Sequence, residues 1–214
     1  MKKCRYAIFD MDGTLIDSMS AWEKLGEDYL NQNGIKVPKN LNEIINAMSM
    51  TESANYFKRE FGIKASVEKI ISDINKLIED KYRYQIQLKP YVKEYLSSLK
   101  SDGVTMCIAT ATPLELSEAA LKRLNVLQYF SCIVCCDEVG VGKTKPDVYY
   151  LAIKKMGAKV EDTIVYEDAD YAMKTAKMAG FYTIGVYDEA SGKTKEEMKL
   201  FCDRYIDSFE DLLL

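Results

Sequence analysis

Residues 4–14 read Cys-Arg-Tyr-Ala-Ile-Phe-Asp-Met-Asp-Gly-Thr, a short apolar run that ends in two aspartates and a glycine. A β-rich apolar run of this length predicts a buried strand, which places the aspartates at its carboxyl end. Asp10 and Asp12 are two positions apart on an extended segment, so their side chains point the same way. Gly13 then supplies the turn that follows the strand.

Four further apolar runs follow, and helical patterns of apolar residues lie between them. Strands that alternate with helices of this length indicate right-handed crossovers and a parallel sheet covered on both faces. The sequence therefore predicts an α/β fold with a doubly wound parallel sheet. The runs span residues 105–109, 132–136, 163–166 and 182–187, and the tail 205–214 predicts a short strand followed by a closing helix.

The interval between the first run and the second contains only helical signals. Apolar residues recur there at helical spacing in several stretches, the longest at residues 67–78. We expect this segment, residues 17–87, to form a separate helical unit above one edge of the sheet. The sheet domain is then discontinuous and consists of residues 1–16 and 88–214.

Composition narrows the classes of function. Hydrophobic residues make up 48% of the 214, enough for a packed core, and 33 acidic against 29 basic side chains predict a slightly acidic surface and no nucleic-acid partner. The apolar stretch behind the basic start of the chain ends at Asp10, too short for a signal peptide or a membrane span, so we expect a cytoplasmic protein. Since the chain has no histidine, acid and base chemistry must use carboxylates, lysines or tyrosines.

Polar residues follow the predicted strands at the edge where an open parallel sheet binds its ligands. Carboxylates gathered at one edge repel each other unless a cation joins them, and a hard, oxygen-preferring ion such as Mg²⁺ suits them. The sequence therefore predicts Mg²⁺ held by Asp10, Glu167 and Asp168. Beyond the first strand, the ends are Thr110-Ala111-Thr-Pro, Gly142-Lys-Thr-Lys-Pro-Asp147 and Glu167-Asp168.

The spacing of Asp10 and Asp12 permits a division of labour around a phosphorus atom. Asp10 can attack phosphorus and become an aspartyl phosphate, while Asp12 protonates the leaving alcohol and then takes a proton from the hydrolytic water. Thr110 and the backbone N–H groups after it, beginning at Ala111, can hold phosphate oxygens. A lysine from the third strand end would spread the developing negative charge.

This arrangement resembles the haloacid dehalogenase superfamily, in particular its phosphatase and phosphomutase branch with a helical cap inserted after the first motif. The resemblance covers nearly the whole chain. It implies a Rossmann-like core with strand order 3-2-1-4-5, and it adds the backbone carbonyl of Asp12 to the Mg²⁺ ligands. The residues that carry it are Asp10-x-Asp12-Gly13-Thr14 for the first motif, Thr110 for the second, the lysine before Pro146-Asp147 for the third and Glu167-Asp168 for the fourth.

The third motif leaves the choice of its lysine open. The family commonly reads Lys-Pro-x-Pro-Asp, whereas this chain reads Lys143-Thr-Lys-Pro-Asp147. Counting back from Asp147 without gaps selects Lys143 as the catalytic and phosphate-binding lysine. A small shift of the glycine-containing loop before it would present Lys145 instead.

Taken singly, each motif also has a structural explanation. The paired acids before Gly13 occur in solvated turns, a threonine at a strand end can bond to a neighbouring backbone group, and Glu167-Asp168 can cap the helix that follows. Four such motifs at four strand ends favour catalysis.

The resulting prediction is a Mg²⁺-dependent phosphatase for a sugar phosphate or similar small metabolite, with no membrane partner and no prediction of oligomeric state. A sugar phosphomutase resembling β-phosphoglucomutase is the alternative within the fold. Against it stand Trp22 and Met50, at positions where that family carries a histidine and an arginine. In another class, residues 137–144 imitate a nucleotide-binding P-loop, but the acid at Asp137 would repel phosphate and Pro146 falls where the P-loop helix should run.

Overall fold

Six parallel strands form one sheet in the computed structural model, which describes residues 4–213. Positions 1–3 and 214, the outer ends of the predicted sheet domain, lie outside the described residues. The order β3-β2-β1-β4-β5-β6 confirms the predicted 3-2-1-4-5 core, and the strand of the tail extends it beyond β5. The strands are β1 (Tyr6–Phe9), β2 (Thr105–Thr110), β3 (Phe130–Cys135), β4 (Thr163–Glu167), β5 (Tyr182–Val186) and β6 (Arg204–Ile206).

The two faces of the sheet are covered by different helices. Successive side chains of β1 point to opposite faces of the sheet, so Phe9 lies in one hydrophobic cluster and Ile8 in another. The first cluster includes residues of α6 (Val92–Ser101) and α7 (Leu114–Arg123), and the second includes residues of α9 (Asp147–Met156) and α10 (Asp170–Met178). The sheet is therefore doubly wound, with helices on both faces, and its central strands β1, β2 and β4 are buried almost throughout. Two short helices, α8 (Cys136–Val139) and α11 (Lys195–Met198), and 3-10 turns at Leu127–Tyr129, Val160–Asp162, Glu189–Ser191 and Phe209–Leu212 complete this part of the chain.

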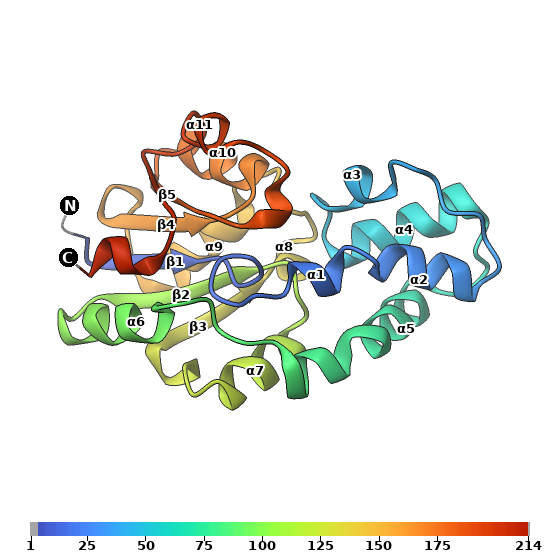
Figure 1. Ribbon diagram of the computed structural model, residues 1–214, viewed down its shortest axis with the longest axis horizontal. Coiled ribbons are helices and arrows are strands. Elements are labelled where there is room, and N and C mark those ends of the chain that lie inside the picture. The colour runs from blue at the N-terminus through green and yellow to red at the C-terminus, as the bar shows by residue number, and fades with distance from the viewer. Residues whose placement is uncertain (1–3, 214) are drawn as a thin grey trace.

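The segment between β1 and α6 is helical, as its periodicity predicts. Figure 1 shows its helices grouped beside the sheet, on the side reached by the carboxyl ends of β1 and β2. The most regular of them, α5, buries Ile70, Ile74 and Ile78 at four-residue spacing. The elements are α1 (Met19–Trp22), α2 (Leu25–Gln32), α3 (Leu41–Ile45), α4 (Met50–Phe61), α5 (Val67–Asp80) and a π-helical turn at Lys81–Gln85.

The two crossings between the sheet and this helical insert run side by side. The N–H of Asp17 donates to the carbonyl of Gln87 at 2.9 Å, and the N–H of Lys89 donates to the carbonyl of Leu15 at 2.9 Å. Ile16 also bridges Leu88 in antiparallel fashion. The insert is thus attached through one short stretch of paired backbone. Among residues 4–213, none of the helices combines the length and the apolar composition needed to cross a membrane.

Candidate active site

Three carboxylates meet at the carboxyl ends of two neighbouring strands. Ligand oxygens of Asp10, Glu167 and Asp168 all lie within 4.8 Å of one another, and all three residues are buried. The parallel register explains the convergence, because Phe9 on β1 pairs with Tyr166 on β4 and the N–H of Asp10 donates to the carbonyl of Tyr166 at 2.9 Å. The polar residues that follow these strands therefore emerge together.

One lysine enters this acidic cluster. Lys143 is 5% exposed, and its Nζ donates to Oδ1 of Asp10 and, at 2.7 Å, to Oε1 of Glu167. Tyr149 OH donates to the same Oε1 at 2.7 Å. Lys145, the other candidate lysine, is exposed. The amine that faces the carboxylates is thus that of Lys143.

Burial makes the negative charge of this cluster unfavourable. It raises the pKa of Glu167 to about 7, although Lys143 acts in the opposite direction. Burial and the neighbouring charges of Asp10 and Glu167 raise the pKa of Asp168 well above its usual range. Burial lowers the pKa of Lys143, but the two carboxylates beside it outweigh this and hold the pKa well above its usual value. The cluster contains one ammonium group and three carboxyl groups, so a bound cation would reduce the repulsion between the carboxylates.

Gly13 makes the close approach of the first loop possible. Its φ of +77° lies in the left-handed region, and a Cβ at this position would stand 2.4 Å from Oδ2 of Asp168. Thr14, the next residue, donates from Oγ1 to Oδ1 of Asp168 at 3.0 Å. The loop after β1 therefore packs directly on the acid that follows β4.

The side chain of Asp12 lies outside the three-acid cluster and is surrounded by donors instead. Its Oδ1 accepts from Ser18 Oγ at 2.6 Å, from Trp22 Nε1 at 3.3 Å and from Tyr82 OH. Its Oδ2 accepts from Thr112 Oγ1 at 2.6 Å. Burial, and next the Asp12 carboxylate, raise the pKa of Tyr82 well above its usual value, so the phenol keeps its proton. Sequence reasoning did not find Ser18, Tyr82 or Thr112 as neighbours of Asp12, and it noted Trp22 only as the residue where the phosphomutase family carries a histidine.

Thr110 is buried at the end of β2, with Ala111 directly after it. Its Oγ1 accepts from the N–H of Thr112 at 3.0 Å, which is the backbone bond that a strand-end threonine forms without any ligand. The same Oγ1 lies 3.5 Å from Oδ2 of Asp12. The predicted phosphate-binding stretch therefore adjoins Asp12.

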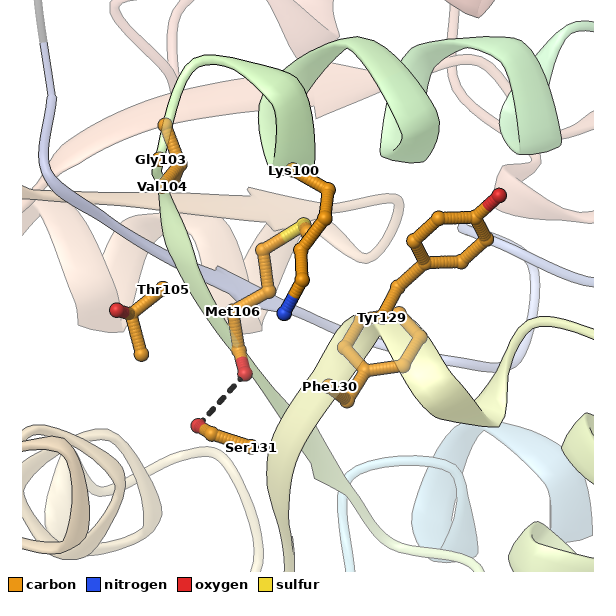
Figure 2. A pocket seen from close by; sticks show the side chains of 8 residues that line it. All are labelled: Lys100, Gly103, Val104, Thr105, Met106, Tyr129, Phe130 and Ser131. Carbon is orange, nitrogen blue, oxygen red and sulfur yellow. Dashed lines mark hydrogen bonds between the residues drawn. The ribbon is translucent and has the colours of Figure 1, made fainter.

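Two surface hollows lie elsewhere. One, of about 250 Å³, lies at the amino ends of β2 and β3, and Lys100 is the only charged residue among those that line it. Figure 2 shows the lining side chains. Another, of about 460 Å³, lies between α5 and the start of α7. The predicted catalytic, phosphate-binding and metal-binding residues line neither hollow, so the candidate site rests on the acidic cluster and the donors around Asp12.

The fold and the site define a class: an α/β enzyme whose acidic residues gather at the carboxyl ends of a doubly wound parallel sheet. The chain belongs to the haloacid dehalogenase-like hydrolases, whose family model matches residues 7–186.

Relatives and solved structures agree with this assignment. The chain is 28% identical over 181 residues to a phosphorylated carbohydrates phosphatase of Thermotoga maritima, covering 83% of this chain and 82% of that protein. It is 26% identical over 187 residues to hexitol phosphatase B of Escherichia coli K12, covering 84% and 82%. CbbY of Rhodobacter sphaeroides, solved in complex with phosphate, shares the fold with a TM-score of 0.83 at 22% identity over 98% of this chain and 96% of that one. The chain is therefore a hydrolase of the phosphatase type.

Proposed function

We propose that this chain is a Mg²⁺-dependent phosphatase that hydrolyses a phosphorylated carbohydrate or similar small metabolite through an aspartyl phosphate on Asp10. The observation that carries the proposal is the buried group of Asp10, Glu167 and Asp168, with Lys143 bonded to two of them. The names of the two curated relatives support a carbohydrate phosphate as the substrate. The helical insert, residues 17–87, would act as a cap over this site.

The donor set fits a hard divalent cation. The three acidic residues offer oxygen ligands, and buried carboxylates that repel one another favour a bound cation of Mg²⁺ type. Asp10, Asp168, Glu167 and the backbone carbonyl of Asp12 would hold it. Lys143 and Tyr149 both donate to Oε1 of Glu167 and so hold this carboxyl group in place. The bound ion would supply positive charge beside the phosphoryl oxygens.

In the first step, a carboxylate oxygen of Asp10 bonds to phosphorus and the bond from phosphorus to the leaving oxygen breaks. The carboxylic acid form of Asp12 gives its proton to that oxygen, which departs as an alcohol. Thr110 and the N–H groups from Ala111 onward would bind the phosphoryl oxygens, and the Lys143 ammonium would offset their negative charge.

In the second step, Asp12 as carboxylate takes a proton from water while the water oxygen bonds to phosphorus. The bond between phosphorus and Asp10 breaks, inorganic phosphate leaves, and both aspartates return to their starting forms. Proton transfer falls to carboxyl groups because the chain has no histidine.

The P-loop alternative requires an ammonium directed at nucleotide phosphates. Lys143 instead bonds to Asp10 and Glu167, and the short helix α8, rather than a glycine-rich turn, follows β3. These features favour the phosphatase.

The test is release of phosphate from p-nitrophenyl phosphate with and without Mg²⁺. We expect turnover that requires the ion and is lost in Asp10→Asn. Retained Mg²⁺-dependent turnover in Asp10→Asn would refute the assignment of the nucleophile. A screen of sugar and hexitol phosphates then identifies the substrate, and β-glucose 1-phosphate with its bisphosphate activator tests the phosphomutase.

A further inference from the structure

We infer that Tyr82, on the turn where the helical insert returns to the sheet domain, is a positioning residue that fixes the carboxyl group of Asp12 for proton transfer to the leaving group. The inference rests on the proposed role of Asp12 as acid and base. Tyr82 is fully buried, and its OH donates to Oδ1 of Asp12.

The directions of the hydrogen bonds identify what Tyr82 does. Trp22 Nε1 donates to Tyr82 OH at 2.7 Å, and an indole N–H can only donate. The phenol oxygen therefore accepts from Trp22, and its single proton is directed to Asp12. Thr112 Oγ1 also lies 3.4 Å from the phenol oxygen and itself donates to Oδ2 of Asp12, so the close hydrogen bond of the phenol proton is the one to Oδ1 of Asp12.

The two oxygens of Asp12 are held from two parts of the molecule. Oδ1 faces Tyr82 and Trp22 from the insert, whereas Oδ2 accepts from Thr112 Oγ1, at the end of a strand of the sheet, at 2.6 Å. Rotation of the carboxyl plane would break bonds on both sides. Such a clamp holds the carboxyl group in one orientation, as a proton donor to a leaving group requires.

The backbone of Tyr82 is fixed to the sheet domain. Arg123, at the end of α7, donates from Nε and Nη2 to the carbonyl of Tyr82 at 3.3 and 3.2 Å, and also to the carbonyl of Ile86. The ring of Trp22 lies edge-on to that of Tyr82, with centroids 6.3 Å apart and an interplanar angle of 81°. Tyr82 lies in a π-helical turn, a feature frequent at functional sites.

A purely structural role for Tyr82 predicts a different outcome when the hydroxyl is removed. A buried phenol that only satisfies its own hydrogen bond contributes to stability, and its loss slows all substrates alike. A phenol that positions an acid matters most when the leaving group needs a proton. Phenyl phosphate and p-nitrophenyl phosphate have nearly the same shape, but the phenolate depends much more on protonation than p-nitrophenolate does.

The experiment compares kcat/KM for these two substrates in wild type and in Tyr82→Phe, with Mg²⁺. We expect kcat/KM for phenyl phosphate to fall about tenfold or more beyond the fall for p-nitrophenyl phosphate, since general acid catalysis contributes about 10²–10⁴-fold. Equal losses on both substrates, or no loss, would overturn the inference. Tyr95→Phe is the matched control, because Tyr95 is also buried and its OH bonds to Tyr166 OH at 2.6 Å, away from Asp12.

Asp12→Asn separates this inference from the function on which it rests. The loss of kcat/KM on phenyl phosphate beyond the loss on p-nitrophenyl phosphate should be larger in Asp12→Asn than in Tyr82→Phe. If Asp12→Asn discriminates and Tyr82→Phe does not, the role of Tyr82 is refuted while that of Asp12 stands. If Asp12→Asn does not discriminate, the proposed acid itself is wrong. If Tyr82→Phe does not fold, Trp22→Phe serves as the test, because it removes the indole N–H that donates to the phenol oxygen. Equal losses of kcat/KM on both substrates in Trp22→Phe would refute the clamp.

Discussion

Replacing Lys143 by methionine removes the one ammonium that bonds within the buried acidic cluster and keeps a side chain of similar length. At 2.7 Å from Oε1 of Glu167, the attraction is about 6 kcal/mol at an effective dielectric of about 20. The full amount is not lost, because burial already raises the pKa of Glu167 to about 7 and the orphaned carboxyl group takes up a proton. We therefore expect the metal-free protein to lose about 3–5 kcal/mol of unfolding free energy, as buried pairs do when one partner is removed.

Urea unfolding at pH 7 without divalent ions measures this loss, and turnover of p-nitrophenyl phosphate with Mg²⁺ measures the catalytic effect. Removal of a preorganised charge that stabilises the transition state should lower kcat by about 10²–10³-fold. Lys145→Met is the matched control, since Lys145 is exposed, and it should change stability by less than about 0.5 kcal/mol. Loss of activity in Lys145→Met with normal activity in Lys143→Met would refute the reasoning.

Three further outcomes are expected. Burial raises the pKa of Glu167 from 4.5 to about 7, so its protonated form stabilises the folded protein at low pH. In metal-free protein, the unfolding free energy of wild type relative to Glu167→Gln should therefore fall by about 3 kcal/mol from pH 4.5 to 7, and chemical denaturation at both pH values would measure this change. Mg²⁺ should offset the fall. Gly13→Ala should abolish turnover and lower the melting temperature, because its Cβ would displace Asp168; wild-type kinetics would contradict the packing described. Glu52→Ala removes an acceptor 2.8 Å from the N–H of Gly142 and should destabilise the protein by about 1 kcal/mol in urea unfolding, whereas Glu60→Ala, at an exposed position on the same helix, should not.

The parallel sheet and the helical nature of the insert could be predicted from the sequence because both depend on local patterns, whereas the strand order was implied only by the resemblance to the family. A parallel strand buried on both faces reads as an unbroken apolar run, and the acids after β1 and β4 lie together because neighbouring parallel strands end at one edge. The place of β6 was not predicted, since a strand of three residues, Arg204–Ile206, carries no signal for its neighbour. Predicted and observed strand ends differ by one or two residues, as at β3, where Cys136 begins α8 instead of ending the strand.

The donors around Asp12 depend on how distant segments meet, and local patterns do not contain that information. Positions 70, 74, 78, 82 and 86 form one buried stripe, and a tyrosine among isoleucines marks a hydroxyl that needs a partner. The stripe does not indicate which group that hydroxyl meets. Likewise, the choice between Lys143 and Lys145 depends on the path of a loop that contains Gly140 and Gly142, which spacing alone could not decide.

The paired backbone at Asp17 and Gln87 brings the two ends of the insert together, so the insert can be considered as an exchangeable cassette. Its two ends lie one hydrogen bond apart, so a short turn could join residue 16 to residue 88 without re-threading the sheet. The proposed role of the insert as a cap implies that its exchange between relatives would alter substrate choice, and the three-carboxylate cluster lies outside the exchanged residues. It would also carry away Trp22 and Tyr82, so a transplanted cassette has to bring its own clamp for Asp12.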